Sequence, residues 1–316
     1  MSTSTNLTTK HLLLALLTVF IWGTNFIAIY IGLKEFPPFL LCAARFGLAA
    51  FPWVFILPRP KAPFKLILGF GVFNFAMQFG LMFTGIHLGL SPGLSSLVLQ
   101  VQVFFSMALA YMFFREKPSL FKIIGSLISF VGIGIVASHI NGSATLIGLI
   151  LTLVAALSWA FGNIYTKKIN SDSPLSLVVW GNLVAFPFMM ILSFIFEGST
   201  VIVHSVKNVS WSTIAAVFYI VYLSTHLGYG LWGYLIKTYS TSAVVPFTLL
   251  VPVVGFITSA LVLNEELTSW KIIASLFIMG GLVFNLFEKR IRKILNKFTR
   301  KTNRTIKTDS DSILKH

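Results

Sequence analysis

The residues best suited to bind a solute are polar and aromatic side chains that interrupt long apolar runs. They recur at helical spacing: Asn74 and Gln78 are one turn apart, as are Ser96 and Gln100. In an apolar setting such groups need hydrogen-bond partners, either on a neighbouring helix or on a bound solute, and both interpretations stay open. The candidates for the wall of a solute cavity are Trp22, Asn25, Asn74, Gln78, Ser96, Gln100, Trp159, Asn163, His226 and Tyr229.

Two ionisable side chains stand out within these runs. Arg45 could extend to water, bind the carboxylate of a solute, act as a gate residue, or link to a neighbouring helix. His226 titrates near neutral pH, so it either relays a proton or is held by hydrogen bonds in the core. Asp and Glu are absent from the deep part of every run, which argues against proton coupling through a membrane carboxylate.

Signatures of other chemistry are missing from the sequence. The single cysteine, Cys42, excludes an intramolecular disulfide, and no His and Cys cluster has the spacing of a metal site. There is no phosphate-binding loop and no H-E-x-x-H motif. We therefore expect no metal, no cofactor and no enzymatic activity.

The composition is that of an integral membrane protein. Hydrophobic residues make up 56% of the 316 residues, charged residues only 10%, and the mean hydropathy is +0.87. The net charge of +15 would suit nucleic acid, but the tail from Lys289 onward is dense in Lys and Arg, as expected beside anionic lipid headgroups. The expected partners are a small-molecule substrate and membrane lipids, not nucleic acid; nothing in the sequence indicates an oligomeric state.

Apolar stretches close to the ~20 residues that cross a bilayer occur repeatedly along the chain. Turn residues such as Pro37-Pro38 and Ser91-Pro92-Gly93 separate them. Because unpaired backbone cannot face lipid, each stretch is predicted to be a helix, giving an all-α membrane protein of ten spans. Pro246, Pro252 and Gly255 predict a kinked ninth helix. The predicted spans are 11–33, 39–57, 65–86, 92–114, 119–138, 145–167, 175–196, 212–236, 242–263 and 270–288.

The two halves of the chain resemble each other. The pattern Lys-Ile-Ile-x-Ser-Leu of residues 122–127 recurs at 271–276, an offset of 149 (271 minus 122), and Gly132 falls on Gly281. Five helices per half is an odd number, so the halves must have opposite orientations, and such inverted repeats are typical of alternating-access transporters. The first helices repeat more weakly, with Trp22 and Asn25 resembling Trp159 and Asn163.

Lys and Arg are unevenly distributed between alternate loops. Outside the tail the split is ten against three, which places both termini in the cytoplasm. The expected organisation is a cytoplasmic tail (1–10), a first repeat (11–138), a second repeat (139–288) and a basic cytoplasmic tail (289–316). The rich set holds Lys10, Arg59, Lys61, Lys65, Arg115, Lys117, Lys122, Lys167, Lys168 and Lys237; the poor set holds Lys34, Lys207 and Lys271.

Two predictions concern contacts between helices. Glu116 and Glu265 occupy matched positions at helix entrances, where a carboxylate complements the helix dipole, so both are expected to cap. Gln102 is rotated by about 200° from Gln100 and is expected to meet a neighbouring helix.

Several motifs carry a resemblance to a known family. Residues 21–26 (IWGTNF), residues 43–46 (AARF) and Glu116 after the fourth span, set in ten short helices, resemble the EamA family of the drug/metabolite transporter superfamily. The resemblance covers residues 10–288 and implies an inner-membrane carrier with a central cavity. Residues 93–102, 158–168 and 249–255 are similar to family members that export amino-acid metabolites such as O-acetylserine and cysteine, whereas His226 replaces the apolar residue that the resemblance implies, which leaves the substrate open.

We therefore expect a secondary transporter that exports small amino-acid-like metabolites across the inner membrane by alternating access. Uptake of an amino acid or a nucleoside-like compound is an alternative, because topology does not encode direction. A membrane scaffold or sensor without transport activity is another.

Overall fold

The computed structural model describes residues 7–140, 144–239 and 241–288 of the chain. The predicted basic tail 289–316 lies outside the described residues, as does 1–6 of the predicted N-terminal tail. Ten described helical segments are long and apolar enough to cross a membrane, which confirms the all-α fold and the predicted number of spans. They are Thr9–Gly32, Pro38–Phe55, Phe64–His87, Pro92–Phe114, Leu120–Ser138, Leu146–Ile169, Pro174–Glu197, Trp211–Thr238, Val245–Leu263 and Ser269–Leu286.

Local sequence explains where many of these helices begin. Ser or Thr side chains accept a backbone N–H at the start of six of them, and Pro occupies an early position in four, where its missing N–H costs nothing. Four spans are single α-helices: α1 (Thr9–Gly32), α7 (Leu120–Ser138), α8 (Leu146–Ile169) and α15 (Ser269–Leu286).

The second and seventh spans change helix type near their ends, and a short extra helix follows the seventh. These elements are α2 (Pro38–Ala50) with the 3₁₀-helix η1 (Trp53–Phe55), α9 (Pro174–Leu192) with the π-helix η4 (Ser193–Glu197), and α10 (Ser199–Lys207).

The other four spans also change helix type, and they do so in matching pairs; the change lies inside the third, fourth and eighth spans and at the start of the ninth. The third and eighth spans contain π-helix; the fourth and ninth contain 3₁₀-helix. Adding 149 to 72–77 gives 221–226, inside the π-helix of the eighth span, and this match supports the predicted repeat. The elements are α3 (Phe64–Gly71), η2 (Val72–Met77) and α4 (Gln78–His87); α5 (Pro92–Val98), η3 (Leu99–Val101) and α6 (Gln102–Phe114); α11 (Trp211–Phe218), η5 (Tyr219–Gly228) and α12 (Tyr229–Thr238); and α13 (Thr241–Val244), η6 (Val245–Leu249) and α14 (Leu250–Leu263).

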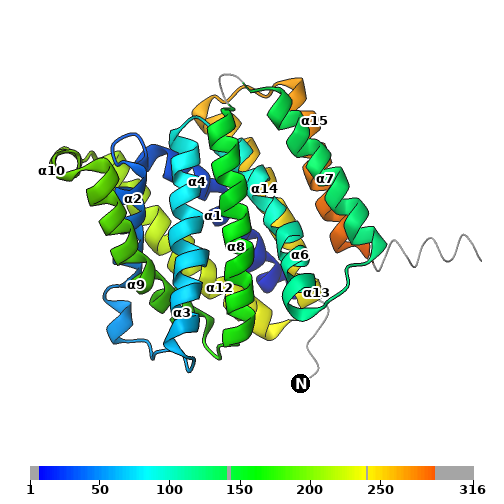
Figure 1. Cartoon of the computed structure of the whole chain (residues 1–316), viewed down its shortest axis with the longest axis horizontal. Helices are drawn as coiled ribbons and strands as arrows, with labels where there is room; N and C mark the ends of the chain where they lie inside the picture. Colours follow the sequence, from blue (N-terminus) through cyan, green and yellow to red (C-terminus); the bar gives the residue numbers. More distant parts are fainter. Residues whose placement is uncertain (1–6, 141–143, 240, 289–316) are drawn as a thin grey trace, which may run out of the picture.

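Helices α7 and α15 pack side by side at one flank of the bundle, and α2 and α9 lie toward the opposite flank (Figure 1). A Cβ added to Gly125 would lie 2.7 Å from the carbonyl oxygen of Gly281, and one added to Gly132 would lie 2.8 Å from that of Ala274. The offset of 149 exchanges these two contacts, as expected for a self-complementary interface. The Ser129 hydroxyl donates to the carbonyl of Ile278, its own repeat mate, at 2.8 Å. These contacts also support the repeat.

The core between these flanks is aromatic. Phe46 of α2 packs edge to face on Phe75 and Phe79, and Phe83 continues the series along α4. All four side chains are buried. Arg45, the charged residue of α2, lies against the Phe79 ring of this aromatic series.

The ninth span begins as 3₁₀-helix and continues as α-helix. Pro246 belongs to the 3₁₀-helix η6, whereas Pro252 and Gly255 lie inside α14. A Cβ on Gly255 would meet the Ser96 hydroxyl oxygen at 2.9 Å, so this glycine allows α14 to approach α5 closely. The kink expected of this helix stays a prediction.

Candidate functional site

Arg45 is the central feature of the candidate site. Its side chain is only 2% exposed, so it does not extend to water as one interpretation of the sequence suggested. The guanidinium carbon lies 3.8 Å from the centroid of the Phe79 ring, and Nη2 donates to the hydroxyl of Thr225 at 3.3 Å. Within the described part of the chain, Nε and Nη1 have no hydrogen-bond partner.

The π-helix η5 brings further predicted residues toward this region. The Trp22 indole N–H donates to the carbonyl of Ser224 at 3.1 Å, and the rings of Trp22 and Tyr229 lie 5.5 Å apart. A π-helical turn spaces its hydrogen bonds more widely than an α-helical turn, and such turns often occur at functional sites. The structure therefore joins Trp22 to Tyr229, and Arg45 to the same π-helix through Thr225.

His226 links η5 to the end of α2. Its Nδ1 lies 3.0 Å from the carbonyl oxygen of Val221, and Nε2 lies 3.0 Å from that of Ala49. A neutral imidazole carries one N–H, so it can donate to only one of these two carbonyls. The ring also packs against Trp53 and Tyr222. These contacts are those of a side chain that connects two helices, and a role as proton relay stays a prediction.

Two predicted residues make helix-to-helix contacts away from Arg45. The Asn163 side-chain amide donates to Gln102 at 3.1 Å and to Ser106 at 3.0 Å, so Gln102 does meet a neighbouring helix. The Ser96 hydroxyl donates to the carbonyl of Gly93 at 2.7 Å, next to the close contact with α14. For both residues the contacts shown are structural ones.

The remaining predicted residues fall into two groups. Asn25 and Gln78 are buried, and in the described part of the chain the carbonyl oxygen of each side chain has no partner. Asn74 is buried against Gly162, where a Cβ would come within 2.5 Å of the Asn74 side-chain oxygen. Gln100 in η3 and Trp159 in α8 are half-buried.

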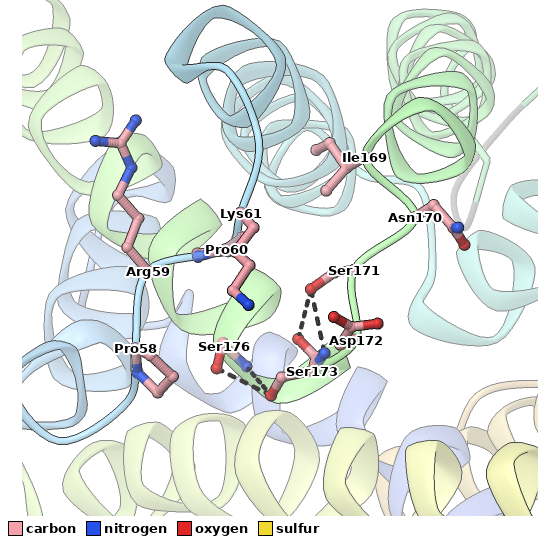
Figure 2. Close-up of a pocket in the computed structure, with 10 residues that line it drawn as sticks. All are labelled: Pro58, Arg59, Pro60, Lys61, Ile169, Asn170, Ser171, Asp172, Ser173 and Ser176. Atoms are coloured by element: carbon pink, nitrogen blue, oxygen red, sulfur yellow. Dashed lines mark hydrogen bonds between the residues drawn. The ribbon is translucent and has the colours of Figure 1, made fainter.

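Two cavities open away from the predicted residues. One, of about 140 Å³, lies between the loops that follow η1 and α8, where Ser171, Ser173 and Ser176 are joined by hydrogen bonds (Figure 2). The other, of about 420 Å³, lies between α1 and α11 beside the hydrogen-bonded hydroxyls of Thr24 and Tyr219. Neither is lined by a predicted site residue.

The two ends of the bundle differ in how helix N-termini are satisfied. We call the end that carries Glu35, Glu197 and Glu265 the acidic end, and the opposite end, at which the chain begins, the basic end (Figure 1). At the acidic end Glu197 accepts the backbone N–H groups of Phe39, at 2.6 Å, and Leu40, at 3.0 Å. The preceding Pro37 has no side-chain acceptor, so a carboxylate from the other half of the chain caps α2.

Glu265 forms a second such contact, at the start of α5. Its carboxylate accepts the Ser91 hydroxyl at 2.5 Å, the Lys271 ammonium at 3.1 Å and, more weakly, the backbone N–H of Gly93 at 3.4 Å. The side chains of Lys271 and Glu265 are only 2% and 8% exposed. Glu265 therefore caps a helix of the first half, not the helix α15 that its sequence position suggested.

Glu35 forms a third contact of this kind, at the start of α11. It accepts the backbone N–H of Ser210 at 2.8 Å. The Ser210 hydroxyl, the same N–H and the Thr213 hydroxyl together lower the pKa of Glu35 from its ordinary value. All three carboxylates thus join one half of the chain to the other.

The basic end is organised differently. Glu116 does not cap a helix as predicted but forms an ion pair with Lys167, and both side chains are about half exposed. The described helices α1, α7 and α9, which begin at this end, are capped by the residues directly before them: Thr8, Ser119 and Ser173. Among the described residues, no carboxylate reaches a helix N-terminus at the basic end.

Sequence reasoning missed several of these residues. Lys271 was counted as a loop residue, whereas it is buried in the first turn of α15, and its spacing of six from Glu265 was the available signal. Thr225 had no distinguishing sequence signal, because it stands in the apolar eighth span and makes contact with α2 only through tertiary packing. Glu197 lies one residue beyond the predicted seventh span, 175–196, and was not among the predicted residues.

The fold and site define a class of protein: a multi-pass helical membrane protein with polar and charged groups enclosed between its helices. The EamA-like transporter family matches residues 9–138 and 146–287, so the chain belongs to this family. It is a transporter rather than an enzyme, located in the bacterial inner membrane, and as a transporter it binds a small-molecule substrate.

Individual proteins with similar sequences or structures give a more specific comparison than the family as a whole. The chain is 41% identical to a probable amino-acid metabolite efflux pump of Salmonella typhimurium over 89% of this chain and 96% of that protein. It is 40% identical to a probable amino-acid metabolite efflux pump of Escherichia coli, over 90% and 97% of the two chains. A solved crystal structure, 16% identical, superposes with a TM-score of 0.61 over 87% of this chain and 95% of its own, which shows the fold alone.

Proposed function

We propose that the protein is a secondary transporter that exports small amino-acid-like metabolites by alternating access between its two halves. The observation that carries the proposal is the difference between the ends: carboxylates of one half cap helices of the other half only at the acidic end, among the described residues. Inverted repeats rock about a central site, so ties between the halves are needed at one end at a time. The structure is therefore interpreted as a state tied at its acidic end.

The orientation of the ends indicates which side of the membrane this state would face. Lys and Arg are concentrated in loops of the basic end, which the positive-inside rule assigns to the cytoplasm. A state tied at the acidic end would then receive its solute from the cytoplasm. The proposed direction, export, rests on the efflux activity named for the two bacterial relatives, and a state that receives solute from the cytoplasm is one that an exporter needs.

Vesicles of defined orientation test the proposal. Inside-out and right-side-out membrane vesicles containing the protein would be loaded with a panel of amino acids, O-acetylserine and nucleosides, and counterflow of each labelled compound measured. We expect amino-acid-like compounds to enter inside-out vesicles faster than right-side-out ones. The opposite preference would indicate uptake, and movement of none of the compounds would refute transport of this class and favour a scaffold or sensor.

A further inference from the structure

The structure contains two buried cations that are treated in opposite ways. Lys271 is held by the Glu265 carboxylate and by the carbonyl of Glu266, at 3.1 and 2.9 Å. Arg45 is equally buried. The described chain has two ion pairs, Lys271 with Glu265 and Lys167 with Glu116, and Arg45 takes part in neither. Arg45 therefore has no carboxylate partner among the described residues.

An enclosed guanidinium without a counter-ion is energetically unfavourable. Arginine does not lose its proton in proteins, so the charge cannot be removed by titration. The Phe79 ring beneath the guanidinium offers a cation–π contact, and Thr225 accepts one hydrogen bond. Two of the three guanidinium nitrogens, Nε and Nη1, still lack an acceptor in the described chain. The missing acceptor is an anion, and carboxylates match the guanidinium best.

Thr225 is positioned to hold the guanidinium rather than to compete for it. Its hydroxyl donates to the carbonyl of Ile220 at 2.9 Å, so its oxygen lone pairs face Arg45. The widened turn of η5 provides this arrangement, because the bond spans five residues. The guanidinium of Arg45 is thereby held between Phe79 of α4 and Thr225 of η5.

Two complementary acceptors lie on α1 and on α4, the helix whose Phe79 ring contacts Arg45. The side-chain oxygens of Asn25 on α1 and of Gln78 on α4 are buried and without a partner in the described chain. Gln78 directly precedes Phe79, whose ring contacts the guanidinium of Arg45. Helix α4, which contains both residues, packs against α1 and α2. Two unpaired acceptors suit a donor-rich group, and an ammonium group offers three donors and no acceptor.

We propose that Arg45 binds the carboxylate of the transported solute and that Asn25 and Gln78 accept hydrogen bonds from its ammonium group. The assignment rests on the proposed transport function and specifies its substrate class as α-amino acids with a free carboxylate. Buried groups that are left unpaired reject ligands lacking the matching group more strongly than an apolar pocket does. Analogues that lack the carboxylate should therefore be poor substrates.

The test uses purified full-length protein in liposomes and counterflow of labelled L-cysteine under reducing conditions. The competitors are unlabelled L-cysteine, its methyl ester, in which the carboxylate is blocked, and cysteamine, which lacks the carboxyl group. We expect L-cysteine to compete at least tenfold better than the ester or cysteamine. This arm needs only the wild-type protein, so it holds even if variants of Arg45 do not fold.

The second arm compares variants. We expect Arg45→Gln to lower L-cysteine counterflow at least tenfold and Arg45→Lys to retain part of it. Arg59→Gln is the matched control, since Arg59 also lies over a phenylalanine ring, Phe64, but is exposed at the basic end. Gel filtration in detergent would confirm that each variant is folded.

The outcomes separate the two proposals. Wild-type protein that moves neither L-cysteine nor any other amino acid would overturn the proposed function, and this assignment with it. Wild-type protein that moves L-cysteine, but is competed equally by ester, amine and acid, would overturn the role of Arg45 alone. Unchanged L-cysteine counterflow in Arg45→Gln would do the same.

Discussion

The acidic and basic ends of the bundle use the same residue type, glutamate, for contacts of different strength. Glu265 is buried, pairs with a buried lysine and reaches the start of a helix in the other half. Glu116, which the repeat matches to it, is exposed and pairs with Lys167 on the surface. Removing one partner from a buried pair costs about 3–5 kcal/mol, whereas an exposed pair contributes about 0–1 kcal/mol.

This difference shows that a repeat in sequence does not imply equal contacts in one conformation. The offset of 149 places Lys122 where Lys271 stands, so the residue types of the buried pair are present at both ends. Only the acidic-end pair is formed in the structure, since Glu116 is bound by Lys167. An alternating carrier is expected to show such an asymmetry in any single state.

The strongest test of the comparison is Glu265→Gln. The substitution leaves the Lys271 ammonium buried without a counter-charge, so we expect a loss of about 3–5 kcal/mol in the free energy of unfolding. Thermal unfolding in detergent measures the effect. Glu116→Gln is the matched control, with an expected loss below about 1 kcal/mol. Adding Lys271→Met to Glu265→Gln should restore part of the stability, because the unpaired charge is then removed.

Equal losses of unfolding free energy for Glu265→Gln and Glu116→Gln would contradict the comparison of the two ends.

A cysteine reporter would further show whether the acidic end loosens. In a Cys42→Ala background, Ser96→Cys lies buried in α5, near the Glu265 contact. Its labelling by a water-soluble maleimide should increase when Glu265→Gln is added, and unchanged labelling would show that the tie does not hold the end closed.

Much of the fold was predictable from the sequence, because membrane spans are governed by length and apolarity. The ten predicted spans agree with the helices to within a few residues at most boundaries. The paired changes of helix type within spans were not predictable, because π- and 3₁₀-helix depend on packing against neighbours rather than on local composition. Residues at these positions, such as Thr225, therefore entered the site only with the structure.

The candidate site was only partly predictable for a related reason. Helical spacing identifies which polar residues face inward, but not which of them already have a partner. Asn163 is satisfied by Gln102, whereas Gln78 and Asn25 have unpaired oxygens in the described chain. The sequence patterns of these residues are equivalent, and the difference arises from which helix lies opposite.

Glu197→Gln should have a smaller effect than Glu265→Gln. The amide oxygen can still accept the N–H of Phe39 or of Leu40, but its NH2 group cannot accept the other, and the charge that favours contact with a helix N-terminus is lost. We expect a loss of about 1–2 kcal/mol, together with faster amide exchange at the start of α2. Ser193→Ala is the control, since it removes only the hydroxyl that donates to Glu197. Unaltered exchange at Phe39 and Leu40 would show that the carboxylate does not secure this helix.

Glu35 should show the smallest effect of the three, and a dependence on pH that identifies it. Its pKa is lowered in the folded protein, mainly by the Ser210 hydroxyl, so folding favours the ionised form. The stabilisation is then complete above the ordinary glutamate value of 4.5 and is lost as pH falls through the lower folded value. The unfolding midpoints of wild type and Glu35→Gln in detergent should therefore differ at pH 7 and converge in acid. A difference that persists below both values, or that grows as pH falls, would mean that the Ser210 contact does not depend on the carboxylate charge, and the acidic end would then be joined by two charged ties rather than three.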